Sequence, residues 1–207
     1  MPDQVIPILL ALLIGYALGA IPFGLILTRV SGGGDIRDIG SGNIGATNVL
    51  RTGNKGLAAA TLLLDILKGY VAVQLASYFL PGTASVAAAG AFFGHLYPIW
   101  LGFKGGKGVA TYAGIMFGLF WQGGVVYALA WLVALAVFRI SSVAGLCAAI
   151  SAPIAAVYFG QTDLAAMLVA CSLIVLWMHR ENIERLFAGT EPRVGRKSDA
   201  KSNVKSE

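Results

Sequence analysis

The chain has 207 residues, of which 57% are hydrophobic and only 12% are charged, and its mean hydropathy is +0.76. A soluble domain carries about 25% charged residues, so this composition excludes a soluble protein and indicates an integral membrane protein. The formal net charge is +5, and most of the basic residues lie in short polar segments between apolar runs.

The first apolar run, 5–30, is too long for the apolar region of a cleavable signal peptide, and Asp3 stands where such a peptide has basic residues. We therefore expect this run to stay in the protein. Cys147 and Cys171 lie in apolar runs without His or Cys at ligand spacing, so we interpret both as packing residues.

Seven apolar runs are candidates for membrane spans: 5–30, 56–80, 84–101, 109–119, 125–138, 142–159 and 164–178. A hydrocarbon core about 30 Å thick needs roughly 20 residues of helix. Backbone in lipid must satisfy its own hydrogen bonds, and the alternating pattern of a membrane β-barrel is absent. We therefore predict an all-α integral membrane protein.

The basic residues predict the orientation. Apart from Lys68, they lie in or beside the connections after the first, third, fifth and seventh runs, whereas the opposite connections carry Asp3 and Asp163. The positive-inside rule places the basic connections in the cytoplasm. We expect about seven transmembrane helices, with the N-terminus outside and the C-terminus cytoplasmic.

The runs 109–119 and 125–138 are short for full crossings and could also be read as one long helix. Lys107 and Arg139 share a side only if the chain crosses an even number of times between them. We therefore favour two short spans or a re-entrant pair, whose depth stays open.

We expect residues 1–192 to form a single transmembrane domain. Residues 193–207 are rich in Lys, Arg, Ser and Asp without hydrophobic periodicity, which predicts a basic, disordered cytoplasmic tail. Three polar, glycine-rich stretches, 41–51, 103–111 and 179–195, fall on the cytoplasmic side. We expect the chemistry there.

Residues 41–51 read Ser-Gly-Asn-Ile-Gly-Ala-Thr-Asn-Val-Leu-Arg. Gly42 and Gly45 permit unusual backbone dihedrals that expose N–H groups, as anion-binding nests do. Polar donors and a planar cation accompany them: Ser41, Asn43, Thr47, Asn48 and Arg51. The alternative is an N-capping turn with Arg51 at lipid headgroups. A cap needs only one such residue, so we favour a phosphate site.

Asp65 and Lys68 are three residues apart on one face of the second run, well inside it. Charges at that depth are costly unless paired, so we interpret them as an ion pair facing the bundle interior, with direct substrate contact as the alternative. Asp35, Arg37 and Asp38 are more ordinary, and we interpret them as a solvated interfacial loop.

Residues 102–111 read Gly-Phe-Lys-Gly-Gly-Lys-Gly-Val-Ala-Thr and lack the spacing of a nucleotide P-loop. A helix N-terminus, free N–H groups, Lys104 and Lys107 still converge there, which favours an anion site over two lysines that only anchor the loop. His95 lies upstream in Gly-His-Leu-Tyr-Pro, and an interhelical hydrogen bond and a catalytic role are equally open for it.

The third stretch begins His-Arg-Glu-Asn-Ile-Glu-Arg. On a continuing helix His179 and Asn182 share a face, while Glu181 and Arg185 pair along another. A His there suits a general base and an Asn suits a donor to a developing oxyanion or phosphate. The alternative is an interfacial helix with a salt-bridged polar face.

Together, Ser-Gly-Asn-x-Gly-Ala-Thr-Asn, Lys-Gly-Gly-Lys-Gly and His-Arg-x-Asn resemble the motifs of the bacterial acyl-phosphate:glycerol-3-phosphate acyltransferases. Each motif alone is weak, but three in this order are specific. The resemblance covers the chain from the first run through the third motif, and only the basic tail lies outside it. It implies a seven-helix, multi-pass enzyme of the bacterial inner membrane with its active site at the cytoplasmic face.

The resemblance further implies acyl transfer from acyl phosphate to the sn-1 hydroxyl of glycerol-3-phosphate. The products would be lysophosphatidic acid and phosphate, in the first acylation step of phospholipid synthesis. Acyl-CoA and acyl carrier protein are not direct donors in this family. We expect the two substrates and the bilayer as partners, and no cofactor, metal, nucleic acid or obligatory protein partner.

Carried over by resemblance, the family's functional positions are Ser41, Arg51, Gly105, Gly106, Gly108, His179 and Asn182, and Glu184 matches a Glu regarded as structural. Because acyl phosphate is already activated, we expect direct attack by the glycerol hydroxyl. Ser41 and Asn43 would donate to the carbonyl or the leaving phosphate, and one such donor can lower a barrier by roughly 3 kcal/mol. An acyl-enzyme on Ser41 stays an alternative, and the base is either His179 or the substrate phosphate.

Three other classes fit less well. An anion or organophosphate transporter should show related halves and charges along a path across the membrane, whereas only Asp65 and Lys68 lie deep here. An alcohol phosphatidyltransferase needs a dense carboxylate cluster for metal, which the sequence lacks. A purely structural membrane protein leaves the three polar stretches without a role.

Overall fold

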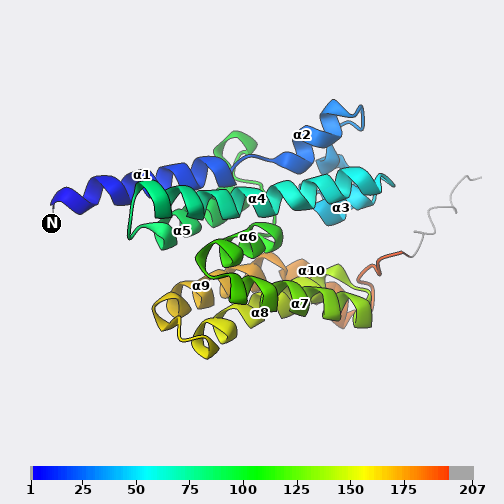
Figure 1. Ribbon diagram of the computed structural model, residues 1–207. Helices are drawn as coiled ribbons and strands as arrows, with labels where there is room; N and C mark the ends of the chain where they lie inside the picture. Colours follow the sequence, from blue (N-terminus) through cyan, green and yellow to red (C-terminus); the bar gives the residue numbers. More distant parts are fainter. Residues whose placement is uncertain (1, 196–207) are drawn as a thin grey trace, which may run out of the picture.

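A computed structural model describes residues 2–195 (Figure 1). The predicted tail falls outside the described residues from 196 onward. In the described part the elements are helical and no strand is present. They are α1 Pro2–Gly19, α2 Phe23–Val30, η1 Ile36–Asp38, α3 Ala46–Leu50, α4 Lys55–Phe79, α5 Ala84–Leu96, η2 Ile99–Leu101, α6 Val109–Leu119, α7 Trp121–Phe138, α8 Ser141–Tyr158, α9 Thr162–Met178 and α10 Arg180–Phe187. The predicted all-α class is confirmed.

Five stretches, Val5–Val30 among them, are long and apolar enough to cross a membrane, or six if the bent pair α9 and α10 forms one span; α6 is apolar but shorter. Large apolar side chains cover the outside of the long helices, including Leu13, Leu63, Val133, Ile154 and Leu173. A soluble protein does not expose so much apolar surface, so these faces suit contact with lipid.

The first apolar run is not one straight helix. α1 ends at Gly19 and α2 starts at Phe23, because Pro22 has no N–H to continue the helical ladder. Lys68 donates a hydrogen bond of 2.9 Å to the carbonyl oxygen of Ile21 at this break. The candidate span 5–30 is therefore confirmed in its extent, and it consists of two helices separated by this break.

The run 109–138 is two helices, as the charge distribution predicted. Phe120 is extended and separates α6 from α7. α7 starts at Trp121, four residues before the expected start, and its 18 residues are long enough for a crossing. Gly124 permits the tight turn, since a Cβ there would collide with the Phe117 ring.

The helices form two layers, with α1, α4 and α5 in one and α7, α8 and α9 in the other, and α6 between them (Figure 1). α1 and α5 pack closely along their lengths. A Cβ on Gly15 or Gly19 would collide with the backbone of Ala87 or Ala91. Small residues of this kind let membrane helices approach each other.

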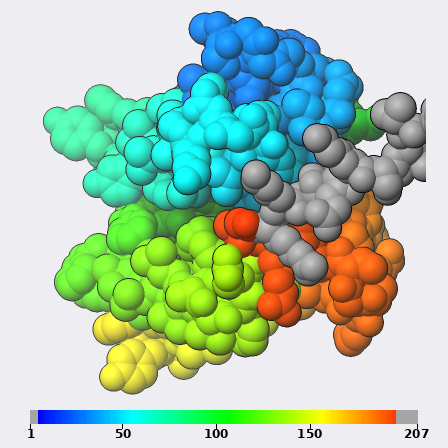
Figure 2. Space-filling model, turned by 90° about the vertical axis from the view of Figure 1, so that its right-hand side faces the viewer, coloured from blue at the N-terminus to red at the C-terminus, as the bar shows by residue number. Residues whose placement is uncertain are grey.

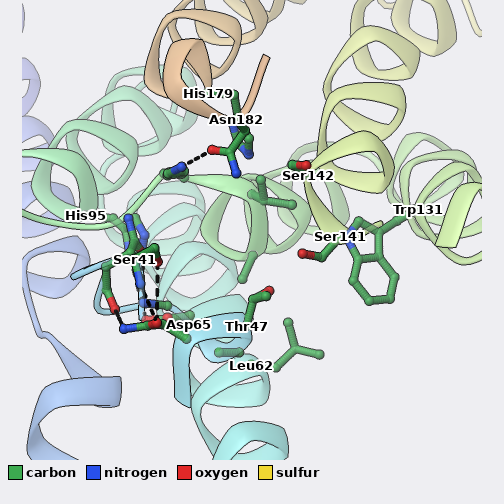
Figure 3. Close-up of a pocket in the computed structure, with 18 of the residues that line it drawn as sticks. Ser41, Thr47, Leu62, Asp65, His95, Trp131, Ser141, Ser142, His179 and Asn182 are labelled. Carbon is green, nitrogen blue, oxygen red and sulfur yellow. Dashed lines mark hydrogen bonds and ion pairs between the residues drawn. The ribbon is translucent and has the colours of Figure 1, made fainter. Parts of the chain in front are cut away.

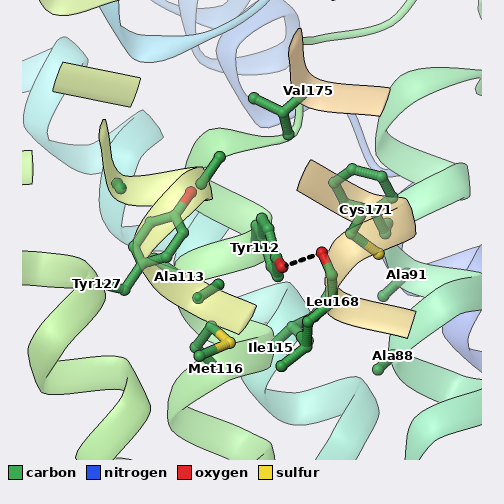
Figure 4. Packing of buried hydrophobic residues seen from close by; sticks show 14 of the residues in the cluster. Ala88, Ala91, Tyr112, Ala113, Ile115, Met116, Tyr127, Leu168, Cys171 and Val175 are labelled. Carbon is green, nitrogen blue, oxygen red and sulfur yellow. Dashed lines mark hydrogen bonds between the residues drawn. The ribbon is translucent and has the colours of Figure 1, made fainter. Parts of the chain in front are cut away.

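An aromatic core joins the layers. Phe92 of α5, Tyr112 of α6 and Tyr127 of α7 have neighbouring ring centroids 5.6 and 5.3 Å apart. The Tyr112 hydroxyl donates to the Leu168 carbonyl of α9 at 2.8 Å (Figure 4). Cys171 is buried in the same core, which confirms its packing role. This core fixes α5, α6, α7 and α9 relative to one another.

Candidate active site

Residues of the three polar stretches come together in the fold, and Figure 2 views the end of the molecule at which the first and third stretches lie. A cavity of about 120 Å³ opens there. Ten of the predicted site residues from these stretches line it: Ser41, Asn43, Gly45, Thr47, Asn48, Arg51, Lys107, Gly108, His179 and Asn182. The convergence predicted from the charge pattern is present in the structure.

Asn48 organises the first loop. Its amide nitrogen donates to the carbonyl oxygens of Ile36 and Ile39 at 2.9 Å and of Asn43 at 2.8 Å. Its side-chain oxygen accepts from the Ser41 N–H at 3.1 Å. These bonds occupy the hydrogen-bonding groups of Asn48, which is 2% exposed, so its side chain holds the loop together and has little left to offer a ligand.

Two glycines at this loop have left-handed backbone angles, Gly40 and Gly42, whereas Gly42 and Gly45 were expected. Gly42, with φ +66°, agrees with the expectation, whereas Gly45 is ordinary extended backbone whose N–H donates to the Asn43 side chain. Gly40 has φ +59°, and a Cβ there would lie 2.7 Å from the Arg51 guanidinium. Gly40 therefore leaves room for Arg51.

Ser41 and Arg51 lie on either side of the Asn48 side-chain oxygen, at 3.4 Å from it in each case. Both are exposed and both line the cavity. Arg51 uses only one donor in this contact, so its remaining N–H groups are available to an anion.

Gly105 and Gly106 do not offer free N–H groups, contrary to expectation. Their N–H groups donate to the carbonyl oxygens of Leu96 and His95 at 3.0 and 2.9 Å. A Cβ on Gly105 would collide with these carbonyls, and one on Gly106 with the His95 ring. Neither glycine lines the cavity, so both are needed for close packing of the loop on the end of α5.

The feature of this loop that suits an anion is the start of α6. Gly108 precedes the helix with φ +86°, and Val109 and Ala110 line the cavity. First-turn N–H groups have no partner inside a helix, and they attract anions. Lys107 donates to the Asn182 side-chain oxygen. Burial, and then the nearby charge of Arg185, lowers the pKa of Lys107.

Lys104 and Gly42, also predicted to bind substrate, do not line this cavity, and Lys104 is exposed.

We expected the third stretch to continue α9 as a straight helix, but it does not. The chain bends by 57° between α9 and α10, at His179. His179 is 4% exposed, and its Nδ1 lies 2.8 Å from the Val175 carbonyl oxygen. A carbonyl only accepts, so Nδ1 carries the hydrogen and Nε2 of the neutral ring has the lone pair a base needs.

Glu191 is the main residue that sequence reasoning missed. It accepts hydrogen bonds from Ser142 at 2.7 Å, from Asn182 at 2.5 Å and from Arg185 at 2.7 Å. Burial alone would raise the pKa of Glu191, but these bonds outweigh it and hold the pKa below its usual range. The signal was a carboxylate in Gly-Thr-Glu-Pro-Arg inside the third polar stretch.

The predicted Glu181–Arg185 pair is absent, because Arg185 pairs with Glu191 at 2.7 Å. Glu181 and Glu184 are both exposed. Within residues 2–195 no side-chain hydrogen bond or ion pair involves Glu184, whereas Glu191 accepts three hydrogen bonds. The structural role carried over to Glu184 by resemblance stays a prediction.

The predicted ion pair between Asp65 and Lys68 is confirmed, with 2.7 Å between Lys68 Nζ and Asp65 Oδ1. His95 Nδ1 lies 3.8 Å from the same oxygen. Asp65 and His95 line the cavity, whereas Lys68 does not (Figure 3).

Four further lining residues come from long helices: Leu62, Trp131, Ser141 and Ser142. No local pattern marks them, because only the packing of α4, α7 and α8 brings them to the cavity.

The loop before the site is a surface ion-pair cluster. Asp35 accepts from Arg29 and Arg37 at 2.6 Å each. Hydrogen bonds from Arg37 hold the pKa of Asp35 well below its usual range. This agrees with the predicted solvated interfacial loop. Among residues 2–195, no three His, Cys, Asp or Glu side chains are grouped as metal ligands would be.

The chain is similar to proteins of one known family. The family described as glycerol-3-phosphate acyltransferase matches residues 9–189. A glycerol-3-phosphate acyltransferase of Mesorhizobium japonicum is 60% identical over 92% of this chain and 97% of its own length. One of Erythrobacter litoralis is 61% identical over 91% of this chain and 95% of its own length.

Two solved structures are similar to the whole fold. One is the glycerol 3-phosphate form of PlsY, described as an integral membrane glycerol 3-phosphate acyltransferase. It has 34% identity and a TM-score of 0.86, and the match covers 91% of this chain and 96% of the other. The lysophosphatidic acid form has 33% identity and a TM-score of 0.84, over 91% and 95% of the two chains.

Proposed function

The chain belongs to the glycerol-3-phosphate acyltransferase family, and we propose that it transfers a fatty acyl group from acyl phosphate to the sn-1 hydroxyl of glycerol-3-phosphate. The products are lysophosphatidic acid and phosphate. The observation that carries this proposal is the convergence of Arg51, Lys107 and the start of α6 on one cavity, because both substrates are anionic phosphates.

We further propose that the cavity lies at the cytoplasmic face of the bacterial inner membrane. About seven helices cross the bilayer, with the N-terminus outside, and residues 1–192 act as one domain followed by a cytoplasmic tail. In Figure 1 the N-terminus and the polar stretches lie at opposite ends of the helices, which supports this orientation.

The reaction is a single displacement. The glycerol hydroxyl oxygen attacks the acyl carbonyl carbon, a carbon–oxygen bond forms, and the bond from that carbon to the phosphate oxygen breaks. Arg51, Lys107 and the N–H groups of α6 hold the phosphates. Ser41 and Asn43 donate to the carbonyl oxygen or the leaving phosphate as negative charge develops.

His179 takes the proton of the attacking hydroxyl. Its Nδ1–H is held by the Val175 carbonyl, which leaves Nε2 as the accepting atom. The competing base is the phosphate of the substrate itself. If His179→Ala kept near-normal turnover, the phosphate would become the better assignment.

Ser41 stays unmodified in this mechanism. In the described part of the chain its hydroxyl has one side-chain partner, Asn48 Oδ1, and no base is hydrogen-bonded to it. A covalent acyl group found on Ser41 after rapid quenching would contradict the single displacement.

The test of the function is purified protein with acyl phosphate and labelled glycerol-3-phosphate, without CoA or carrier protein. We expect labelled lysophosphatidic acid. Its absence, in protein that remains folded in detergent, would reject the acyl-phosphate donor.

A further inference from the structure

Asp65 of α4 and His95 of α5 border a part of the cavity that phosphate binding does not explain. Both side chains are nearly enclosed, at 3% and 4% exposed, and both line the cavity near Ser41 (Figure 3). The question is what kind of group this wall is built to receive.

This wall has no net charge when His95 is neutral. Lys68, which lies outside the cavity lining, neutralises Asp65 at 2.7 Å and also donates to a backbone carbonyl at the start of α2. Other parts of the lining carry the cations Arg51 and Lys107. The cavity therefore has a cationic part suited to phosphate and a neutral polar part suited to an uncharged group.

The His95 ring is held by close packing against Gly106. Its Nδ1 is buried and has no hydrogen-bond partner among residues 2–195, and Gly106 packs so closely on the Nε2 side that a Cβ would collide. Leaving a buried polar atom unpaired is costly, and such atoms are usually paired in a finished structure. A ligand group that pairs with Nδ1 would remove this cost.

The spacing indicates a hydroxyl. His95 Nδ1 and Asp65 Oδ1 are 3.8 Å apart, which is too long for a direct hydrogen bond. One hydroxyl placed beside the two atoms, on the cavity side, would accept from the imidazole N–H and donate to the carboxylate. A hydroxyl suits this place because it has one donor and two acceptor sites.

We propose that Asp65 and His95 form the subsite for the hydroxyl of glycerol-3-phosphate that is not acylated, the one on C2. This rests on the proposed function. The acceptor has a phosphate end and a diol end, and the two parts of the cavity match them. Holding both ends leaves the primary hydroxyl directed at the acyl donor, so the pair sets acceptor specificity.

The test compares glycerol-3-phosphate with 3-hydroxypropyl phosphate, which keeps the phosphate and the primary hydroxyl but lacks the second one. A site built to bind a hydroxyl rejects the analogue without it, and we expect kcat/KM about 100-fold lower for the analogue. His95→Leu should lower kcat/KM for glycerol-3-phosphate by a similar factor and change the analogue by less than about threefold.

Two further variants act as controls. His95→Asn keeps a polar group near the position of Nδ1 and should recover part of the preference. Thr111→Val removes another buried, unpaired hydroxyl that does not line the cavity, and should leave both acceptors unchanged. If His95→Leu still turns over the analogue, the variant is folded. If it does not fold, the two acceptors are compared with wild type and His95→Asn alone.

The proposal is overturned if wild-type protein uses both acceptors within about threefold, or if the His95 variants slow both equally. Failure of the proposed function looks different, since wild type would then make no lysophosphatidic acid from acyl phosphate. In that case binding of the two acceptors is compared by thermal shift, and equal shifts reject the subsite.

Discussion

Two polar clusters border the same cavity: an interfacial cluster of Lys107, Ser142, Asn182, Arg185 and Glu191, and a buried cluster of Asp65, Lys68 and His95. In the first, Glu191 is surrounded by donors from α8 and α10. In the second, Lys68 has two partners, whereas His95 Nδ1 has no hydrogen-bond partner among residues 2–195. The interfacial cluster therefore holds α8 and α10 together, whereas the buried cluster leaves His95 Nδ1 available to a ligand.

The largest expected effect is at Glu191. Glu191→Ala removes the acceptor of three hydrogen bonds, and we expect a loss of about 3 kcal/mol in the free energy of unfolding together with loss of activity. Thermal unfolding in detergent measures it. Glu184→Ala is the matched control and should change stability by less than about 0.5 kcal/mol. Equal effects of the two variants would contradict the role given to Glu191.

The buried cluster should respond differently because its charges balance each other. Lys68→Met leaves Asp65 charged and unpaired, and we expect a loss of about 3 kcal/mol in stability without the direct loss of a cavity-lining group. Adding Asp65→Asn should restore part of that loss, since no uncompensated charge remains. A double variant less stable than the single one would show that the two residues are not coupled in this way.

A smaller effect is expected at the lysines of the glycine-rich loop. Lys107→Met should raise KM for glycerol-3-phosphate about tenfold, because a cation at the cavity is lost. Lys104→Met, outside the lining, should change KM by less than about twofold. Steady-state kinetics of both variants measure the two KM values. Equal increases would show that Lys104 also contacts the substrate.

The smallest effect is the pH dependence of the interfacial cluster. The pKa of Glu191 is lower in the folded protein than its ordinary value near 4.3. Its contribution to stability is therefore complete above that ordinary value and is lost as the pH falls through the folded pKa. The stability difference between wild type and Glu191→Gln should be constant from pH 6 to 8 and should shrink in acid. A constant difference down to pH 3 would contradict the assignment.

The helices and the meeting of the three polar stretches could be predicted from the sequence. The length of an apolar run, and the side of the membrane on which basic residues lie, depend little on tertiary contacts. The break at Pro22 had a local signal in proline itself. The Phe120 break was predicted only through the charges of Lys107 and Arg139.

Other features could not be read from the chain because they depend on packing. Gly105 and Gly106 looked like a phosphate loop, yet they allow close packing against His95. Glu191 and Ser142 meet across 49 positions of sequence, and no local spacing indicates that contact. Arg185 had a carboxylate at helical spacing in Glu181 and pairs with another one.

The start of α6 contributes to the site through backbone rather than side chains. Its N–H groups do not lose a proton in the physiological range, so their attraction for anions is independent of pH. Among single substitutions only a change to proline removes one of them, and it removes only the N–H of that residue. An inhibitor that presents a phosphonate to these groups would therefore meet contacts that resistance mutations cannot simply remove, whereas contacts to Arg51 or Lys107 could be lost in one step.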